Sequence, residues 1–507
     1  MTMLKFYVIR TNTCGIHNVP GLRDSFCLIL IYDRSEKTSS KMGDDSSEKP
    51  PDRISKPLMA AVASYACQFQ LGAILGQSSN MLPQLQAADS PIQIDYDSAT
   101  WIASMDVLGT PISCLLCGPL TDKMGRKATI RLFLLLSAVG HAIVGVASDV
   151  TEILIGRFCL GIAAGFAFPS IVYISEISSV EHRTPLLAIN TISSSFGLLY
   201  VFIVGAFISW DIISLMTSLI SVISLVYAFF IPESPAWLFQ NHRLNDAIDS
   251  IKWLKGDDCD MTQELKQLKD ACTEEPKGTG TIFRHFTGVT VVKPFFILMF
   301  FAFLQNGTGF YILLHYSINF ISEFKIDFDP RFISIGLAVV RLSVCIMASY
   351  FLSRVNRKTA GMVSGTGMVV VLGGTLVAMY FMMGDATVST GYSVIVTVGL
   401  LAFIFVCGLG AHPLPWIMIY ELYPLHVRGT MCGVSNAINY VFIFIFIKMY
   451  YVLILNLQIH GTVILFAAFS AAFAAYSFLI LPETQGKSLV EIEQGFLPKK
   501  QRQNGSA

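Results

Sequence analysis

The sequence predicts an all-α membrane protein whose twelve transmembrane helices form two pseudo-repeated six-helix bundles. Three observations lead to this fold class. Of the 507 residues, 53% are hydrophobic and only 14% are charged, a composition that ordinary soluble domains do not have. From Leu58 onward, twelve apolar segments each reach the roughly 20 residues that a helix needs to cross hydrocarbon. Finally, the two sets of six segments carry matching charged residues at their ends.

The segments follow one another in a simple order. Residues 1–57 end in a polar stretch rich in Ser, Lys, Asp and Glu, which predicts a cytoplasmic, largely disordered N-terminus. The N-terminal bundle, 58–231, contains spans at about 58–78, 98–120, 129–148, 151–174, 186–209 and 212–231. Residues 232–293 form a charged linker with helical patterning. The C-terminal bundle, 294–481, contains spans at about 294–320, 331–353, 360–383, 391–417, 430–454 and 459–481, and a cytoplasmic tail, 482–507, follows.

The loops predict the orientation. One side holds most of the basic residues: Lys123, Arg126, Lys127, Arg131, Arg183, Arg354, Arg357, Lys358 and Arg428. The loops of the opposite side are acidic, with few cations beyond Lys325 and Arg331. Because basic loops stay in the cytoplasm, both termini and the linker are expected there.

The loop after the second span carries the most specific motif. Residues 118–127 read GPLTDKMGRK, with an acid, a glycine and an Arg–Lys pair between two membrane-length segments. This spacing resembles the loop signature of the major facilitator superfamily. The stretches GRFCLGIAAG, YISEISSVEHR, PESPAWLF, ELYPLHVRG and LPETQGKSLVEIE narrow the resemblance to its sugar porters, from about residue 58 to 495. Within them the chain is similar to insect facilitated trehalose transporter-like proteins and to intracellular-type glucose carriers. The resemblance implies the major facilitator fold and alternating access.

Charged residues recur at corresponding ends of the two halves. Glu176 and Arg183 follow the fourth span with the same separation as Glu421 and Arg428 after the tenth, and a Pro-Glu pair follows both the sixth and the twelfth span. We expect these residues to form a cytoplasmic gate, pairing across the two bundles while the outer mouth is open. The alternative is that each charge anchors its own helix end at the head groups. The gate set is Asp122, Arg126, Lys127, Glu176, Arg183, Glu233, Arg357, Glu421, Arg428 and Glu483.

The resemblance also implies a sugar site. The seventh span carries Gln305, Asn306 and Tyr311 at family polar positions, although Tyr311 replaces an Asn and Asn306 a Gln. An aromatic ring for stacking on a sugar is expected at Trp416, and further polar positions are Asn436 and Thr191. For each polar residue, hydrogen bonding between helices is the alternative role.

Arg341 is a departure from the family, since an Asn usually stands there, midway along the eighth span. A cation at that depth needs a partner or a ligand. It is expected either to bind the substrate, which could then be anionic, or to pair with an acid such as Asp106.

The sequence also indicates how transport would be driven. The family's proton-coupled members carry an acid in the first span, where we place Gln70, and the sequence has no Walker-type phosphate loop. The prediction is therefore a non-enzymatic, monomeric uniporter of trehalose or glucose in the plasma membrane, without cofactor or nucleic-acid partner. Because Asp106 is an acid within a span, proton-coupled symport is a second hypothesis. Transport of a different solute and a non-transporting sugar receptor are a third and a fourth.

Overall fold

The computed structural model describes residues 55–256, 259–273, 288–382, 389–424, 427–487 and 489–496. Helices dominate these residues, which contain no strand. Twelve helical units within them are long and apolar enough to cross a membrane, which confirms the predicted fold class. The predicted disordered N-terminus lies outside the described residues except for 55–57, which belong to the first helix.

The N-terminal bundle is formed by seven helices, because its fourth span is interrupted at Phe166 and Ala167. Inside the bundle, α1 packs along α6, α2 along α4, and α3 against both α4 and α7. Their bounds are α1 (Ser55–Leu85), α2 (Tyr96–Met124), α3 (Arg126–Gly145), α4 (Val150–Gly165), α5 (Phe168–Ile177), α6 (Val180–Gly205) and α7 (Trp210–Tyr227).

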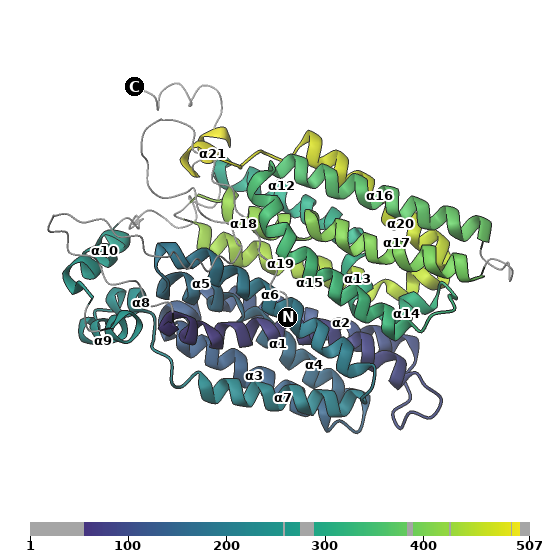
Figure 1. The fold of residues 1–507 in the computed structure, drawn as a ribbon, viewed down its shortest axis with the longest axis horizontal. Coiled ribbons are helices and arrows are strands. Elements are labelled where there is room, and N and C mark those ends of the chain that lie inside the picture. The colour runs from purple at the N-terminus through teal and green to yellow at the C-terminus, as the bar shows by residue number, and fades with distance from the viewer. Residues whose placement is uncertain are drawn as a thin grey trace, which may run out of the picture.

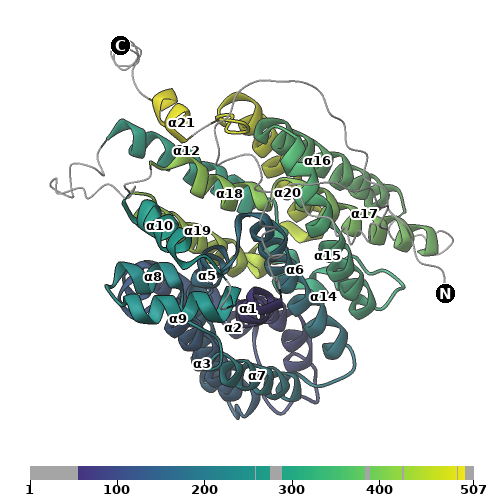
Figure 2. The same ribbon diagram turned by 60° about the vertical axis from the view of Figure 1, so that its left-hand side comes forward.

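Three short helices of the linker lie at one end of this bundle, as Figures 1 and 2 show. They are α8 (Pro235–Gln240), α9 (Leu244–Lys255) and α10 (Met261–Thr273). The indole Nε1 of Trp237 in α8 donates to the carbonyl of Asp122 at 2.8 Å, so the linker is attached to the end of α2. We call this end of the molecule the linker end and the opposite one the far end.

The C-terminal bundle repeats the arrangement with more interruptions. Its helices are α12 (Val289–Gly307), α13 (Phe310–His315), α14 (Ser317–Ser322), α15 (Pro330–Arg354), α16 (Arg357–Met382), α17 (Ser389–Leu409), α18 (Pro413–Leu422), α19 (Arg428–Lys448) and α20 (Tyr450–Leu479), followed by α21 (Leu489–Phe496). The continuous spans predicted at 294–320 and 391–417 are both broken. The first breaks at Gly309, whose φ of +86° suits a residue without Cβ, and the second breaks just before Pro413.

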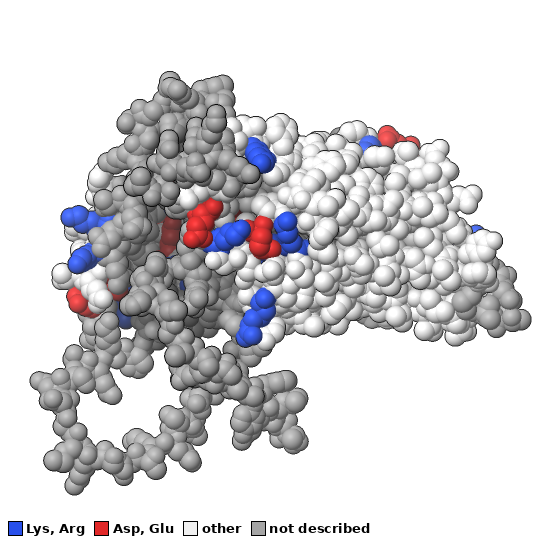
Figure 3. Space-filling view, turned by 90° about the horizontal axis from the view of Figure 1, so that it is seen from above, with Lys and Arg blue, Asp and Glu red and all other residues white. Residues whose placement is uncertain are grey.

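The two bundles meet along their length. In Figure 1 the N-terminal helices form the lower half and the C-terminal helices the upper half, with the helix axes running between the two ends. The main contacts between the bundles are α2 with α19 and α6 with α15, while α1 also touches α13 and α14. On the face shown in Figure 3, most acidic and basic side chains gather toward one end, and uncharged side chains cover most of the rest. Such a face suits contact with lipid.

Candidate functional site

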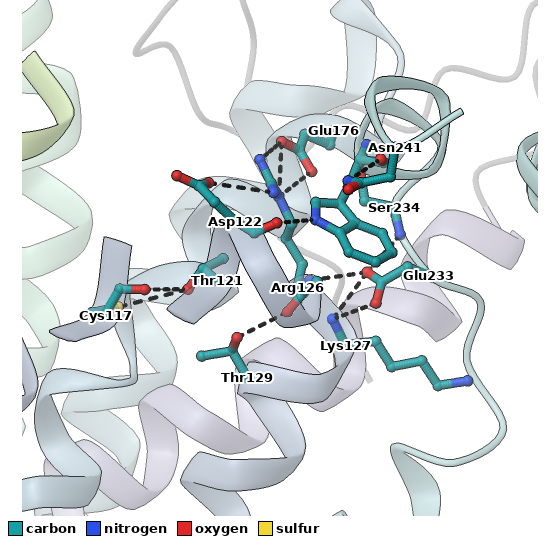
Figure 4. A network of polar contacts seen from close by, with 12 residues as sticks. Cys117, Thr121, Asp122, Arg126, Lys127, Thr129, Glu176, Glu233, Ser234 and Asn241 are labelled. Carbon is teal, nitrogen blue, oxygen red and sulfur yellow. Dashed lines mark hydrogen bonds and ion pairs between the residues drawn. The ribbon is translucent and has the colours of Figure 1, made fainter. Parts of the chain in front are cut away.

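Charged side chains from three elements meet at the linker end of the N-terminal bundle (Figure 4). Arg126 begins α3, and its guanidinium contacts Glu176 of α5: Nε lies 3.2 and 3.0 Å from the two carboxylate oxygens and Nη2 lies 2.9 Å from one of them. Asp122 approaches the same guanidinium only to 3.9 Å, and its side chain is 80% exposed. Because water screens exposed pairs, Glu176 is the main partner of Arg126.

Next to this ion pair, the Glu233 carboxylate caps the N-terminus of α3. Its carboxylate accepts hydrogen bonds from the backbone N–H groups of Arg126 at 3.1 Å and Lys127 at 3.0 Å, and from Ser234 at 2.9 Å. The first two N–H groups have no partner within the helix, and they carry partial positive charge. Burial raises the pKa of Glu233, while the N–H groups and Arg126 act in the opposite direction. Gly125 turns the chain here with φ +93°, and a Cβ at this position would meet the Glu233 carboxylate.

The C-terminal bundle repeats this arrangement. Arg357 begins α16, and its Nη2 contacts Glu421 of α18 at 2.8 Å. Glu483 accepts from the N–H groups of Arg357 at 3.0 Å and Lys358 at 3.2 Å, as Glu233 does in the first half. Ser353 occupies the position where the first half has an acid, so this set lacks the exposed acidic partner that Arg126 has in Asp122.

All of these contacts join helices of the same bundle. The expected pairing of the gate residues across the two bundles does not occur in this structure: within the described ranges, none of the ten forms an ion pair or hydrogen bond with the other bundle. Arg428 donates to the carbonyl of Tyr423 at 3.1 Å, Lys127 to that of Phe229 at 3.2 Å, and Arg183 is exposed. Repetition in the sequence does not indicate which helix each charge faces, so pairing across the bundles while the outer mouth is open stays a prediction.

Several polar contacts between the bundles lie at the far end, and Cys345 of α15 meets Ser195 of α6 farther along the interface. Lys448, the last residue of α19, reaches across to α2, where its Nζ lies 3.1 Å from the Asp97 carboxylate, 2.6 Å from the Thr100 hydroxyl and 3.9 Å from the centre of the Trp101 ring. Gln86 of the N-terminal bundle donates to Tyr451 at 2.8 Å. The molecule is therefore fastened at the far end and carries separate ion pairs in each bundle at the linker end.

A cluster of aromatic and polar side chains lies midway between the ends, where the bundles meet. The ring of Trp416 in α18 lies 5.6 Å from that of Tyr440 in α19 and 6.4 Å from that of Phe168 in the other bundle. The ring of Tyr311 in α13 lies 5.9 Å from that of His412, the residue that precedes α18. Tyr311 therefore lies beside the start of the helix that carries Trp416, and a site shared with Arg341 stays a prediction.

Several polar atoms near this cluster are buried without a partner. In Gln305 both amide atoms are unpartnered, and in Arg341 both Nε and Nη1 are. The Nδ2 of Asn306 donates to Asn439 at 2.9 Å, which is the alternative helix-to-helix role, but its Oδ1 and the Oδ1 of Asn436 remain without a partner. Unpaired buried groups are costly, so groups gathered in this way are suited to bind a hydroxyl-bearing ligand. Thr191 is exposed, and its hydroxyl reaches only the Leu187 carbonyl, at 3.5 Å.

Asp106 does not pair with Arg341. It lies 2.9 Å from Arg157 of α4, and both side chains are almost fully buried, at 5% and 0% exposed. Arg157 also donates to Ser78 of α1 and, at 3.0 Å, to the carbonyl of Ile102. Gln70, which we placed at the family's acid position, instead donates to the Thr217 carbonyl at 3.3 Å, inside the N-terminal bundle. Among the first-span residues, Ser78 thus faces the buried arginine and Gln70 does not.

Three residues of interest were missed from the sequence. Arg157 stands in the stretch GRFCLGIAAG, and a cation within an apolar span was a sufficient signal. The ring of His412, which precedes α18, stacks on Phe310 at 4.5 Å, yet its Nδ1 is buried without a partner. Lys448 gave no signal, because a lysine at the end of a span is ordinary.

Comparisons with known proteins agree over most of the chain. A family model described as sugar (and other) transporter matches residues 58–496. The facilitated trehalose transporter Tret1 of Apis mellifera ligustica is 27% identical, with 89% of this chain and 90% of the relative covered. The protein of the same name from Bombyx mori is 26% identical, with 86% of each chain covered.

Solved structures show the same fold. The proton:xylose symporter XylE bound to 6-bromo-6-deoxy-D-glucose superposes with a TM-score of 0.68 and 19% identity, covering 88% of this chain and 100% of that one. The inward open conformation of XylE from E. coli gives a TM-score of 0.69 and 18% identity, with 85% and 98% covered. At this level of identity the likeness concerns the fold.

Proposed function

The chain belongs to the sugar (and other) transporter family, and on that premise we propose that it carries a small sugar down its gradient across a membrane by alternating access. It is a multi-pass membrane transporter, which confirms the predicted resemblance to sugar porters of the major facilitator superfamily. Trehalose and glucose are the first substrates to test, since the Apis and Bombyx relatives are trehalose transporters.

The observation that carries the proposal is the position of the unpartnered polar groups. They lie on α12, α15 and α19, and α15 and α19 make the main contacts with the N-terminal bundle. Lys448 and Gln86 fasten the two bundles together at the far end. Alternating access requires such a central site, with closing contacts that can change ends while each bundle stays intact. The ion pairs of Arg126 and Arg357 supply that integrity, because each holds the helices of one bundle.

We assign the sugar site to the central residues. Trp416 offers a ring for the apolar face of the sugar, and Gln305, Asn436 and Asn306 offer amide atoms to its hydroxyls. Tyr311 and Arg341 line the same place. Thr191, the predicted member from the N-terminal bundle, is exposed, so its part in the site stays a prediction.

The linker end is proposed to face the cytoplasm, which places both termini there and makes this the inward-facing conformation. The basic loops at that end support the orientation. In the outward-facing conformation the linker ends of the bundles would approach, and residues such as Arg183 and Arg428 would then be able to pair across the interface, as the gate hypothesis requires. A monomer in the plasma membrane is the simplest form that meets these requirements.

The test is uptake of radiolabelled glucose and trehalose into proteoliposomes, with equal pH on both sides and with an imposed pH gradient. Saturable uptake of either sugar that does not depend on the gradient is the expected result. Binding without uptake would indicate a receptor instead. The absence of both from a monodisperse preparation would refute the sugar assignment.

A proton-coupled mode is the second candidate, favoured by one observation. Asp106 is a buried acid in contact with Arg157 at the centre of the N-terminal bundle. If it exchanges a proton during transport, uptake will respond to the imposed pH gradient, and Asp106→Asn will abolish that response while retaining exchange of the sugar.

A further inference from the structure

Arg341 is a buried cation without a counter-charge. It lies midway along α15 and is only 6% exposed. Its Nε and Nη1 have no hydrogen-bond partner, and no carboxylate in the described parts of the chain forms an ion pair with it. Asp106, an acid that also lies within a span, is occupied by Arg157. Burying a charge without a partner has a free-energy penalty several times that of an exposed charge. The site around Arg341 therefore lacks a negatively charged group.

The guanidinium lies at the interface between the bundles. Cys345, one turn along the same face of α15, contacts the hydroxyl of Ser195 in α6 at 3.2 Å, so this face is directed toward the N-terminal bundle. Tyr311 and His412 lie within electrostatic range of the guanidinium, and their rings are 5.9 Å apart. Because His412 stands one helical turn before Trp416, we place the cation in the proposed sugar site.

The neighbours of Arg341 favour negative charge as well. His412 is the residue that precedes α18, and its Nδ1 is buried without a partner. The N-terminus of α18 carries partial positive charge. A phenol hydroxyl, an imidazole nitrogen and a guanidinium can all donate to an oxygen anion, whereas a neutral sugar would leave the charge of Arg341 uncompensated.

We propose that the substrate of this transporter is a sugar that carries a carboxylate, such as a hexuronate, with the carboxylate on Arg341 and the sugar ring on Trp416. This inference rests on the proposed sugar transport and narrows its substrate class. The carboxylate supplies the missing counter-charge, with Tyr311 and His412 as additional donors, and the amides of Gln305 and Asn436 remain available to the hydroxyl groups.

Glucose and glucuronate provide a matched pair of probes, because they differ only in the oxidation of the terminal hydroxymethyl group to a carboxylate. In proteoliposomes we expect saturable glucuronate uptake. Its half-saturation concentration should be on the order of tenfold lower than that for glucose, because a charge-assisted contact usually raises affinity by about this factor. Uniport of a monovalent anion must also follow the membrane potential, with tenfold accumulation for about 59 mV, inside positive, while glucose uptake is unaffected.

Variants and a competition assay test the role of Arg341. Arg341→Asn is expected to weaken glucuronate uptake by at least roughly tenfold while glucose uptake persists, and Arg341→Lys to retain part of it. Arg354→Asn is the matched control, because this arginine at the end of the same helix lies away from the central site and should leave both activities unchanged. Competition by glucuronate against glucose uptake in the unmodified protein needs no variant and is unaffected by any folding defect.

Four outcomes would overturn the proposal. Glucose uptake without either transport of, or competition by, glucuronate would refute the carboxylate assignment and leave the sugar transport standing. An equal loss of glucose and glucuronate uptake in Arg341→Asn would show that the cation serves the structure. Glucose uptake that requires chloride would show that the cation binds a free anion. Uptake of neither glucose, trehalose nor glucuronate would refute the proposed function itself.

Discussion

The contacts of Lys448 are predicted to hold the bundles together at the far end, so Lys448→Met should shift the transporter toward the conformation open at that end. The methionine keeps much of the length of the side chain and removes its charge. Three interactions are lost together: the ion pair with Asp97, the hydrogen bond to Thr100 and the contact with the Trp101 ring. Each joins α19 to α2, and thus one bundle to the other.

The free energy that these three contacts contribute follows from how exposed the partners of Lys448 are. The Asp97 side chain is 75% exposed, so its ion pair contributes about 0.5 kcal/mol after screening. The hydrogen bond from the charged Nζ to Thr100, which is largely buried, contributes about 1.5 kcal/mol. The cation–π contact with Trp101 adds roughly 0.5 kcal/mol. The loss of lysine side-chain entropy offsets part of the sum. About 2 kcal/mol remains, which changes the ratio of the two conformations by roughly thirtyfold.

The assay is a distance measurement between spin labels on the two bundles at the far end. Asp89 and Asn456 are exposed there, and labels are introduced in a background without reactive native cysteines. We expect Lys448→Met to move most of the distance distribution to longer values. Lys325→Met is the matched control, since this lysine is exposed in the loop before α15. Identical distributions in the two variants would refute the assignment of Lys448 as a contact that selects the conformation.

Further predictions concern the linker end and the central site. Arg126→Gln should lower the free energy of unfolding by about 3 kcal/mol, because it leaves the Glu176 carboxylate half-buried and unpaired. Asp122→Asn should lower the same free energy by about 0.5 kcal/mol or less. Thermal unfolding in detergent measures both variants, and equal effects would contradict the ranking of the two ion pairs. Since burial raises the pKa of Glu233, the folded protein holds a proton there at pH values where the unfolded chain has lost it. The Glu233 contribution to stability is therefore present below the ordinary carboxyl pKa and is lost as pH rises through the raised value. The melting temperature of the native protein relative to Glu233→Gln should accordingly rise as the pH falls toward about 4.5, and a flat difference would contradict the shift. Trp416→Leu should raise the half-saturation concentration for the transported sugar by roughly tenfold without changing the melting temperature by more than a few degrees; unchanged transport would exclude the ring from the site.

Much of the fold could be predicted because the length of an apolar segment is a local property. Each of the twelve spans had to bury its backbone polar groups in a helix, so composition alone predicted where the spans lie. The breaks in the seventh and tenth spans were missed, although Gly309 and Pro413 mark them. Neither residue breaks a helix in every context, and the surrounding helices decide whether the chain turns there.

The pairing of the charged residues was likewise predicted only in part. Repetition in the sequence predicted that Arg126 and Arg357, with Glu176 and Glu421, act as corresponding sets, and the structure gives them corresponding partners. It did not predict that the partners lie within one bundle, because the sequence contains no information on which face of a helix meets which neighbour.

The sequence by itself thus determined the membrane class, the number of spans, the repeated halves and the residue types available to a central site. The tertiary structure decided which charges are paired. It placed Asp106 against Arg157 and left Arg341 without a counter-charge beside Tyr311 and His412. The physical reason is that an ion pair depends on a few ångströms of separation between helices distant in sequence. Those separations are set by the packing of the whole bundle.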